Sequence, residues 1–106
     1  MNLRIRTAAI CLLAASLAAP VFAQSAGADT YKAKCAMCHG PDGTAATPMG
    51  KMMNIPSFKS PDQVKATDAA LIAITKDGKG KMPSYNGKLT DDQIKDVVSF
   101  IRTLQK

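Results

Sequence analysis

The chain has 106 residues, with 14 Lys or Arg, 8 Asp, no Glu and a net charge of +6. This length allows one small domain, which excludes large catalytic domains and transmembrane transporters. Three cysteines are too few for a multi-disulfide scaffold.

Residues 1–23 predict a secretory signal peptide. Arg4 and Arg6 are followed by 17 uncharged residues, and the segment ends Val-Phe-Ala, with small side chains at both cleavage-recognition positions. Cleavage is therefore expected before Gln24. The apolar run is short and rich in Ala for a membrane span, and an N-terminal anchor is the alternative. The two arginines are not adjacent, so the twin-arginine export route has no support.

The remaining domain, residues 24–106, is poor in large apolar side chains. Its 83 residues carry 12 basic and 8 acidic side chains, a net charge of +4, and 32 of them are hydrophobic. Cys11 leaves with the signal peptide, so two cysteines remain. Such a small core is marginal for stability, and we expect a disulfide, a metal or a buried cofactor to supplement it.

Two helices are predicted in the first part of the domain. The first covers about residues 26–38, where a tyrosine and two cysteines recur at helical spacing. The second covers about residues 67–76, with Thr67 as its N-cap and Gly78 as its C-terminal stop. A Ser-Pro pair at 60–61 indicates a weaker helical turn before it, with the serine as the cap.

The strongest helical pattern begins at Thr90. Thr90 and Gln93 predict a capping box, and Leu89 and Ile94 occupy the positions of a hydrophobic staple. One helical face is then apolar, at Ile94, Val97, Val98, Ile101 and Leu104. No segment alternates with a period of two, so we expect an all-α fold without a sheet.

Two long segments, residues 40–59 and 77–89, show no periodicity. The first is rich in Gly, Pro and Met. Loops of this length in so small a domain are usually functional or disordered. Wrapping of these loops around a cofactor would explain both their length and the thin core.

The segment Cys35-Ala36-Met37-Cys38-His39 is the attachment signature of c-type haem. Two thiols three residues apart on a helical turn can each add to one vinyl group of the porphyrin. His39 lies four residues after Cys35, on the same helical face, so its imidazole can point at the iron. The sequence therefore predicts one covalently attached haem c.

Three other uses of these side chains are possible chemically. A disulfide between Cys35 and Cys38 is one, and a thioredoxin-like redox pair is another, although the latter requires a βαβ context that this sequence lacks. A zinc site requires four ligands, whereas one histidine and two cysteines are available.

The second axial position must be filled by a methionine or stay open, because His39 is the only histidine. Met37 lies inside the attachment motif and cannot reach the far face. Met82 lies in the second loop, and Pro83 restricts its backbone to extended conformations, so Met82 is the predicted ligand. The alternative is that Met82 only fills space in the core. Space filling is the favoured interpretation for three other methionines, which are expected at the haem edge, with one as a fallback ligand: Met49, Met52 and Met53.

Together these residues resemble class I cytochromes c, of the short bacterial and photosynthetic type akin to cytochromes c5, c6 and c553. The resemblance covers the whole domain after the signal peptide. It rests on Gly27, Tyr31, Cys35–Gly40, Pro48, Gly80–Tyr85 and the helix containing Phe100.

The resemblance implies three main helices and long loops wrapped around one haem. Gly27 would allow close crossing of the first and last helices, with Tyr31 packing near Phe100. The Pro48 carbonyl would accept a hydrogen bond from the second nitrogen of His39 and orient the ring.

Ligation by His39 and Met82 leaves no iron position for a substrate, so we expect a soluble one-electron carrier and not an enzyme. The expected location is the periplasm, or the thylakoid lumen in a cyanobacterium. Two alternatives are a haem c subunit of an oxidoreductase complex and a ligand-binding or sensing haem protein with a labile distal site.

Six lysines fall in or near the segments that should border the haem: Lys32, Lys34, Lys51, Lys79, Lys81 and Lys88. A basic rim would steer a monomeric carrier toward acidic patches on membrane or periplasmic redox proteins. The alternative is that these lysines only confer solubility. Neither nucleic-acid binding nor stable membrane insertion is expected.

Overall fold

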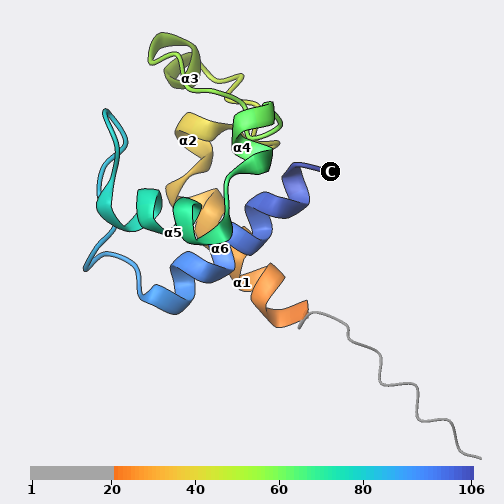
Figure 1. The fold of residues 1–106 in the computed structure, drawn as a ribbon, viewed down its shortest axis with the longest axis vertical. Helices are drawn as coiled ribbons and strands as arrows, with labels where there is room; N and C mark the ends of the chain where they lie inside the picture. The colour runs from red at the N-terminus through yellow and green to blue at the C-terminus, as the bar shows by residue number, and fades with distance from the viewer. Residues whose placement is uncertain (1–20) are drawn as a thin grey trace, which may run out of the picture.

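The computed structural model describes residues 21–106, which form six α-helices and no strand (Figure 1). The helices are α1 (Val21–Lys34), α2 (Ala36–His39), α3 (Pro48–Met52), α4 (Pro61–Lys65), α5 (Asp68–Asp77) and α6 (Asp91–Leu104). The predicted all-α fold with three main helices, α1, α5 and α6, is confirmed. Most of the predicted signal peptide lies outside the described residues, and α1 continues across the expected cleavage point.

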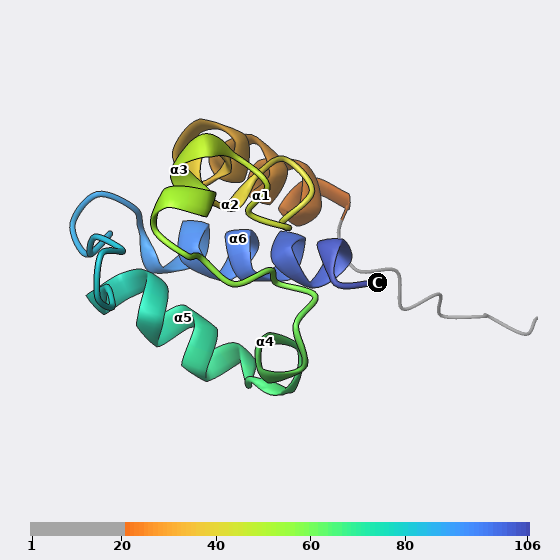
Figure 2. The same ribbon diagram turned by 90° about the horizontal axis from the view of Figure 1, so that it is seen from above.

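Helix α6 forms the centre of the fold. It packs against α1 on one side and α5 on the other. Figure 2 shows α1, α2 and α3 grouped above α6, with α4 and α5 below it. Within the described part of the chain, no helix combines the length and the hydropathy that crossing a membrane requires.

The α6 sequence forms its helix as predicted. The Thr90 hydroxyl accepts a hydrogen bond from the Gln93 amide at 3.1 Å, and the Gln93 side chain accepts one from the Thr90 amide at 2.9 Å. This capping box satisfies two amides that a helix start otherwise leaves without partners. The apolar face then buries Ile94, Val97, Val98 and Ile101.

The crossing of α1 and α6 depends on Gly27. A Cβ atom added to Gly27 would overlap the backbone oxygen of Asp96 and lie 3.2 Å from Cβ of Phe100. The helices can therefore approach this closely only because Gly27 has no side chain. Tyr31, one turn further along α1, is 2% exposed, and its ring centroid lies 5.2 Å from that of Phe100. The structure confirms the predicted packing of Gly27, Tyr31 and Phe100.

Arg102 on α6 holds the connection between α4 and α5. Its guanidinium donates to the Asp68 carboxylate at 2.8 Å and to the side-chain oxygen of Gln105 at 2.9 Å. It also donates to three backbone carbonyls, those of Gln63, Val64 and Ala66. The sequence patterns did not indicate this arrangement, since the partners in and between α4 and α5 lie 34 to 39 residues from Arg102.

The predicted loop 40–59 contains a helix that the sequence analysis missed. The Thr47 hydroxyl caps α3 by accepting a hydrogen bond from the Gly50 amide at 2.9 Å. At the other end, the amides of Asn54 and Ile55 donate to the carbonyls of Lys51 and Gly50, with Asn54 at φ 52°. This pattern is a Schellman motif, in which Asn tolerates the left-handed conformation. A Thr-Pro pair at 47–48 was the sequence signal for this helix.

Two smaller expectations are corrected. The predicted first helix is interrupted at Cys35, where a turn separates α1 from α2. Ser60 precedes Pro61 at the start of α4, but its hydroxyl does not cap the helix. Instead, that hydroxyl donates to the carbonyl of Ser57 at 2.7 Å.

Replacing Gly27 with Ala should lower the free energy of unfolding by about 1–3 kcal/mol, because the new methyl group forces α1 away from α6. The measurement is urea unfolding of the holoprotein. As a control, Asp29→Ala changes an exposed residue of the same helix and should stay within about 0.5 kcal/mol. Equal stability of the two variants would contradict the close crossing.

Candidate functional site

A cavity of about 670 Å³ lies between the Cys35–His39 segment and the loop that carries Met82. This volume is within the range of pockets that enclose a small molecule or cofactor, about 300–1,000 Å³. The lining is mostly apolar, and all six helices contribute residues to it. It includes Cys35, Cys38, His39, Met49, Met53, Ile55, Pro56, Phe58, Leu71, Ile74, Thr75, Lys79–Pro83, Tyr85, Val97 and Ile101.

Both cysteines of the attachment motif line this cavity as free thiols. The amide of His39 donates to the carbonyl of Cys35 at 3.0 Å, so the motif forms one helical turn. Burial and the neighbouring Cys38 raise the pKa of Cys35 to about 11. The two thiols are therefore free at one cavity wall, rather than joined in the disulfide considered as an alternative.

The His39 ring stacks on the ring of Phe58, with centroids 4.6 Å apart and planes 17° from parallel. Burial lowers the pKa of His39, which favours the neutral imidazole that a metal ligand requires. Its Nδ1 atom is buried and has no hydrogen-bond partner among the described residues. Because Nδ1 is shielded and the ring lines the cavity, Nε2 is the nitrogen that faces the cavity.

The predicted hydrogen bond from His39 to the Pro48 carbonyl is not found, since Nδ1 has no partner in the described part of the chain. The physical reason is that Pro48 is the first residue of α3, so its carbonyl points along the helix axis, as an intrahelical hydrogen bond requires. Thr47 instead ties α3 to the motif by donating to the Cys38 carbonyl at 3.0 Å. Pro56 lines the cavity, two residues before the ring that stacks on His39. The Ile-Pro-Ser-Phe run at 55–58 was the signal that the sequence analysis missed.

The loop after α5 places Met82 at the cavity wall. Lys79 and Met82 exchange two backbone hydrogen bonds, of 3.1 and 2.9 Å, around a tight turn with Gly80 at φ 57°. The Tyr85 amide then donates to the Thr75 carbonyl of α5 at 3.2 Å. The Tyr85 hydroxyl donates to the carbonyl of Lys34 at 3.1 Å, so this loop is also bound to the end of α1.

The structure separates the five candidate methionines. Met82, Met49 and Met53 line the cavity. Met37 is 76% exposed and Met52 is 69% exposed, and neither lines it. The expectation that Met52 lies at the haem edge is therefore wrong, because α3 turns that residue outward.

The basic rim is narrower than predicted. Lys34, Lys79 and Lys81 are exposed residues that line the cavity. The other three lysines do not line it, and the Lys88 amine lies 5.9 Å from the centroid of the Tyr85 ring.

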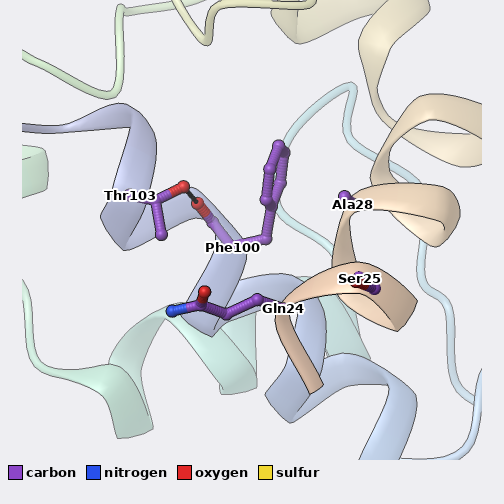
Figure 3. Close-up of a pocket in the computed structure, with 5 residues that line it drawn as sticks. All are labelled: Gln24, Ser25, Ala28, Phe100 and Thr103. Atoms are coloured by element: carbon purple, nitrogen blue, oxygen red, sulfur yellow. Dashed lines mark hydrogen bonds between the residues drawn. The ribbon is translucent and has the colours of Figure 1, made fainter. Parts of the chain in front are cut away.

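A second pocket is a shallow groove where α1 crosses α6 (Figure 3). Its lining is Gln24, Ser25, Ala28, Phe100 and Thr103, and it contains none of the predicted ligands. In residues 21–106, no three His, Cys, Asp or Glu side chains gather as a zinc site requires. The cavity at the attachment motif is therefore the candidate functional site.

Comparisons with known proteins agree with this geometry. The family model described as "Cytochrome C oxidase, cbb3-type, subunit III" matches residues 22–101. Cytochrome c6 of Leptolyngbya boryana is 32% identical over 80 residues, which cover 73% of this chain and 87% of that protein. Cytochrome c-551 of Halorhodospira halochloris is 37% identical over 67 residues, covering 63% of this chain and 77% of that protein. The chain belongs to the cytochrome c family.

The solved structure of the KustC0563 c-type cytochrome matches with a TM-score of 0.70 and 28% identity, covering 76% of this chain and 98% of that one. The cofactor of this family is covalently attached haem c, as predicted. The described residues fit that group in three respects: the cavity volume, the paired thiols and the neutral imidazole with its shielded Nδ1.

Tyr31 supports the end of the attachment motif. Its buried hydroxyl donates to the carbonyl of Gly40, the residue after His39, at 2.6 Å. Burial, followed by the neighbouring Cys35 and Asp42, raises the pKa of Tyr31 well above its ordinary value. The folded protein thus binds the phenolic proton more tightly than the unfolded chain does.

Tyr31→Phe should cost about 1 kcal/mol of unfolding free energy at neutral pH, because the hydrogen bond to Gly40 is lost. The raised pKa stabilises the fold below pH ~10, and this contribution falls as the pH rises further. The difference between the two proteins should therefore be constant from pH 6 to 9 and narrow above pH ~10. Urea unfolding across this range tests it, and a constant difference at every pH would contradict the role of the phenol.

Proposed function

We propose that the protein is a periplasmic one-electron carrier, with haem c bound covalently by Cys35 and Cys38 and ligated by His39 and Met82. The observation that carries the proposal is the composition of one cavity. The two attachment cysteines, the chain's only histidine and a methionine from a distant loop all line it. Electron transfer by haem c is the function of cytochromes with this arrangement of donors.

Each residue has a distinct task in this proposal. Cys35 and Cys38 fix the cofactor permanently, and the stack on Phe58 holds the plane of the His39 ring. The backbone turn from Lys79 to Met82 presents the thioether from the other side of the cavity. When bound, the haem supplies a ferric/ferrous couple whose potential is raised by methionine ligation and by burial.

The proposal includes no catalytic reaction on the iron. His39 and Met82 would occupy both axial positions, so no position is left for a substrate. Apolar side chains of α5 and α6, including Leu71, Val97 and Ile101, line the cavity and would limit the access of water to the bound cofactor. Such a site favours electron exchange through the cofactor edge over binding of small molecules.

The export signal and the lysines complete the proposal. Export directed by residues 1–23, followed by their removal, would deliver the chain to the compartment where c-type haem is attached in bacteria. Lys34, Lys79 and Lys81 line the cavity and would bring the cofactor edge toward acidic patches on redox partners.

A second candidate is a haem c subunit of an oxidase complex. The observation that favours it is the matching family description, which names a subunit of a cbb3-type cytochrome c oxidase. Comigration of the protein with a larger membrane complex on native gels would support the subunit over the free carrier.

Met82→Ala should abolish the methionine-to-ferric charge-transfer band and lower the reduction potential of the holoprotein. Affinity for imidazole should rise about a hundredfold if the native distal position is open about 1% of the time. Optical titration with imidazole measures the band and the affinity, and a redox titration measures the potential. Met52→Ala is the matched control, because this exposed side chain does not line the cavity.

Two outcomes would contradict this ligand assignment. Loss of the band in Met49→Ala or Met53→Ala, with the band retained in Met82→Ala, would move the ligand to α3 or its C-cap. High-spin iron or rapid carbon monoxide binding in the unmodified protein would favour the ligand-binding alternative over the carrier.

Reversing two charges at the cavity, with Lys79→Glu and Lys81→Glu combined, should slow reduction of ferricyanide by the ferrous protein roughly threefold to tenfold at about 10 mM ionic strength. Reduction of a cationic cobalt complex should become faster. Stopped-flow mixing measures both rates. Lys65→Glu, on α4 and outside the cavity lining, should change them far less. An effect of Lys65→Glu on ln k half as large as that of the double variant would indicate net charge alone, because it changes the charge half as much.

A further inference from the structure

The end of α5 lies in direct contact with the backbone that carries Met82. Gly78 follows the last residue of α5, with φ at +79°. A Cβ atom added to it would lie 2.8 Å from the carbonyl oxygen of Met82, 2.9 Å from the amide nitrogen of Ser84 and 3.0 Å from the carbonyl carbon of Pro83. The first two separations are shorter than real Cβ contacts and the third is at their lower limit, so the Met82–Ser84 backbone occupies the space that a side chain would need.

Hydrogen bonds on both sides of this contact hold it in place. The Gly78 amide donates to the carbonyl of Ile74 at 2.8 Å and closes the last turn of α5. The chain reverses through the turn from Lys79 to Met82 and passes back across the helix end. There the Ser84 hydroxyl donates to the carbonyl of Lys76 at 2.6 Å. The position of Met82 relative to α5 is thus fixed by one hydrogen bond that precedes it in the chain and one that follows it.

We infer that Gly78 is a positioning residue for Met82: the missing side chain lets the Met82 backbone lie against the end of α5 and so sets the reach of the thioether into the cavity. This inference rests on the proposed ligation by Met82. A methyl group at position 78 would push the Met82–Ser84 segment outward. The thioether would then bind less tightly and be displaced more easily by an external ligand.

The chain offers matched controls for this effect. Gly80 and Gly87 also have positive φ angles, of +57° and +78°. A Cβ atom at either would meet nothing within 4 Å among the described residues. Gly80 belongs to the turn that presents Met82, whereas alanine at Gly87 introduces the backbone strain of a left-handed residue outside that turn. Gly87 is the closer match because its φ is nearly that of Gly78.

The test compares Gly78→Ala with Gly87→Ala in the holoprotein. Imidazole affinity should rise about tenfold in Gly78→Ala, as overpacking of a tight contact predicts. The charge-transfer band should weaken, and the reduction potential should fall. Gly87→Ala should lower the thermal midpoint but leave the band, the potential and the imidazole affinity unchanged.

If Gly78→Ala does not fold, Ser84→Ala provides the same test with a milder change. Loss of the hydrogen bond to Lys76 loosens the same segment, and imidazole affinity should rise about threefold. Native imidazole affinity in the folded Gly78→Ala variant, or in Ser84→Ala if the first does not fold, would overturn the inference.

Met82→Ala separates this inference from the proposed function. If Met82→Ala keeps the charge-transfer band, the ligand assignment fails and the inference fails with it. If Met82→Ala loses the band while Gly78→Ala keeps both the band and native imidazole affinity, only the positioning role of Gly78 is wrong.

Discussion

The crossing of α1 and α6 is the contact on which the site depends. Gly27 lets the two helices approach, and this buries Tyr31 beside Phe100. The Tyr31 hydroxyl then binds the carbonyl of Gly40 and fixes the end of the attachment motif. Since α6 also supplies Val97 and Ile101 to the cavity, one helix crossing determines how the motif faces its opposite wall.

The two proposed ligands are held in different ways. The turn that carries His39 is short and local, and its carbonyl contacts come from residues nine positions away. Met82 arrives through α5, which packs on α6 and supports the loop at its C-terminal end. The hydrogen bond from Tyr85 to Lys34 spans 51 residues and joins the two ligand-bearing segments directly. Ligation by both residues would therefore unite halves of the domain that otherwise meet mainly through α6.

Local sequence signals predicted most of the helices, whereas the contacts between residues far apart in the sequence became known only from the structure. Short runs of residues predicted the capping box and apolar face of α6 and the two ends of α5. The structure confirms all of these features. Helix α3 has five residues and no periodic pattern, and the contact of Thr47 with Cys38 helps hold it. For the same reason the sequence did not indicate that Phe58 stacks on His39, or that Pro48 lies outside the cavity. Met82 was placed at the cavity correctly because its loop precedes a well-marked helix.

The bonds made by Arg102 have a consequence for the conditions under which the protein keeps its shape. A guanidinium stays charged throughout the pH range in which proteins fold. Its partners at Gln63, Val64 and Ala66 are peptide carbonyls, which do not titrate. The exposed Asp68 is the one charged partner among these groups, and loss of that single contact would leave the carbonyl contacts intact. The attachment of α4 to the domain therefore depends less on pH than an attachment made by an ion pair alone would.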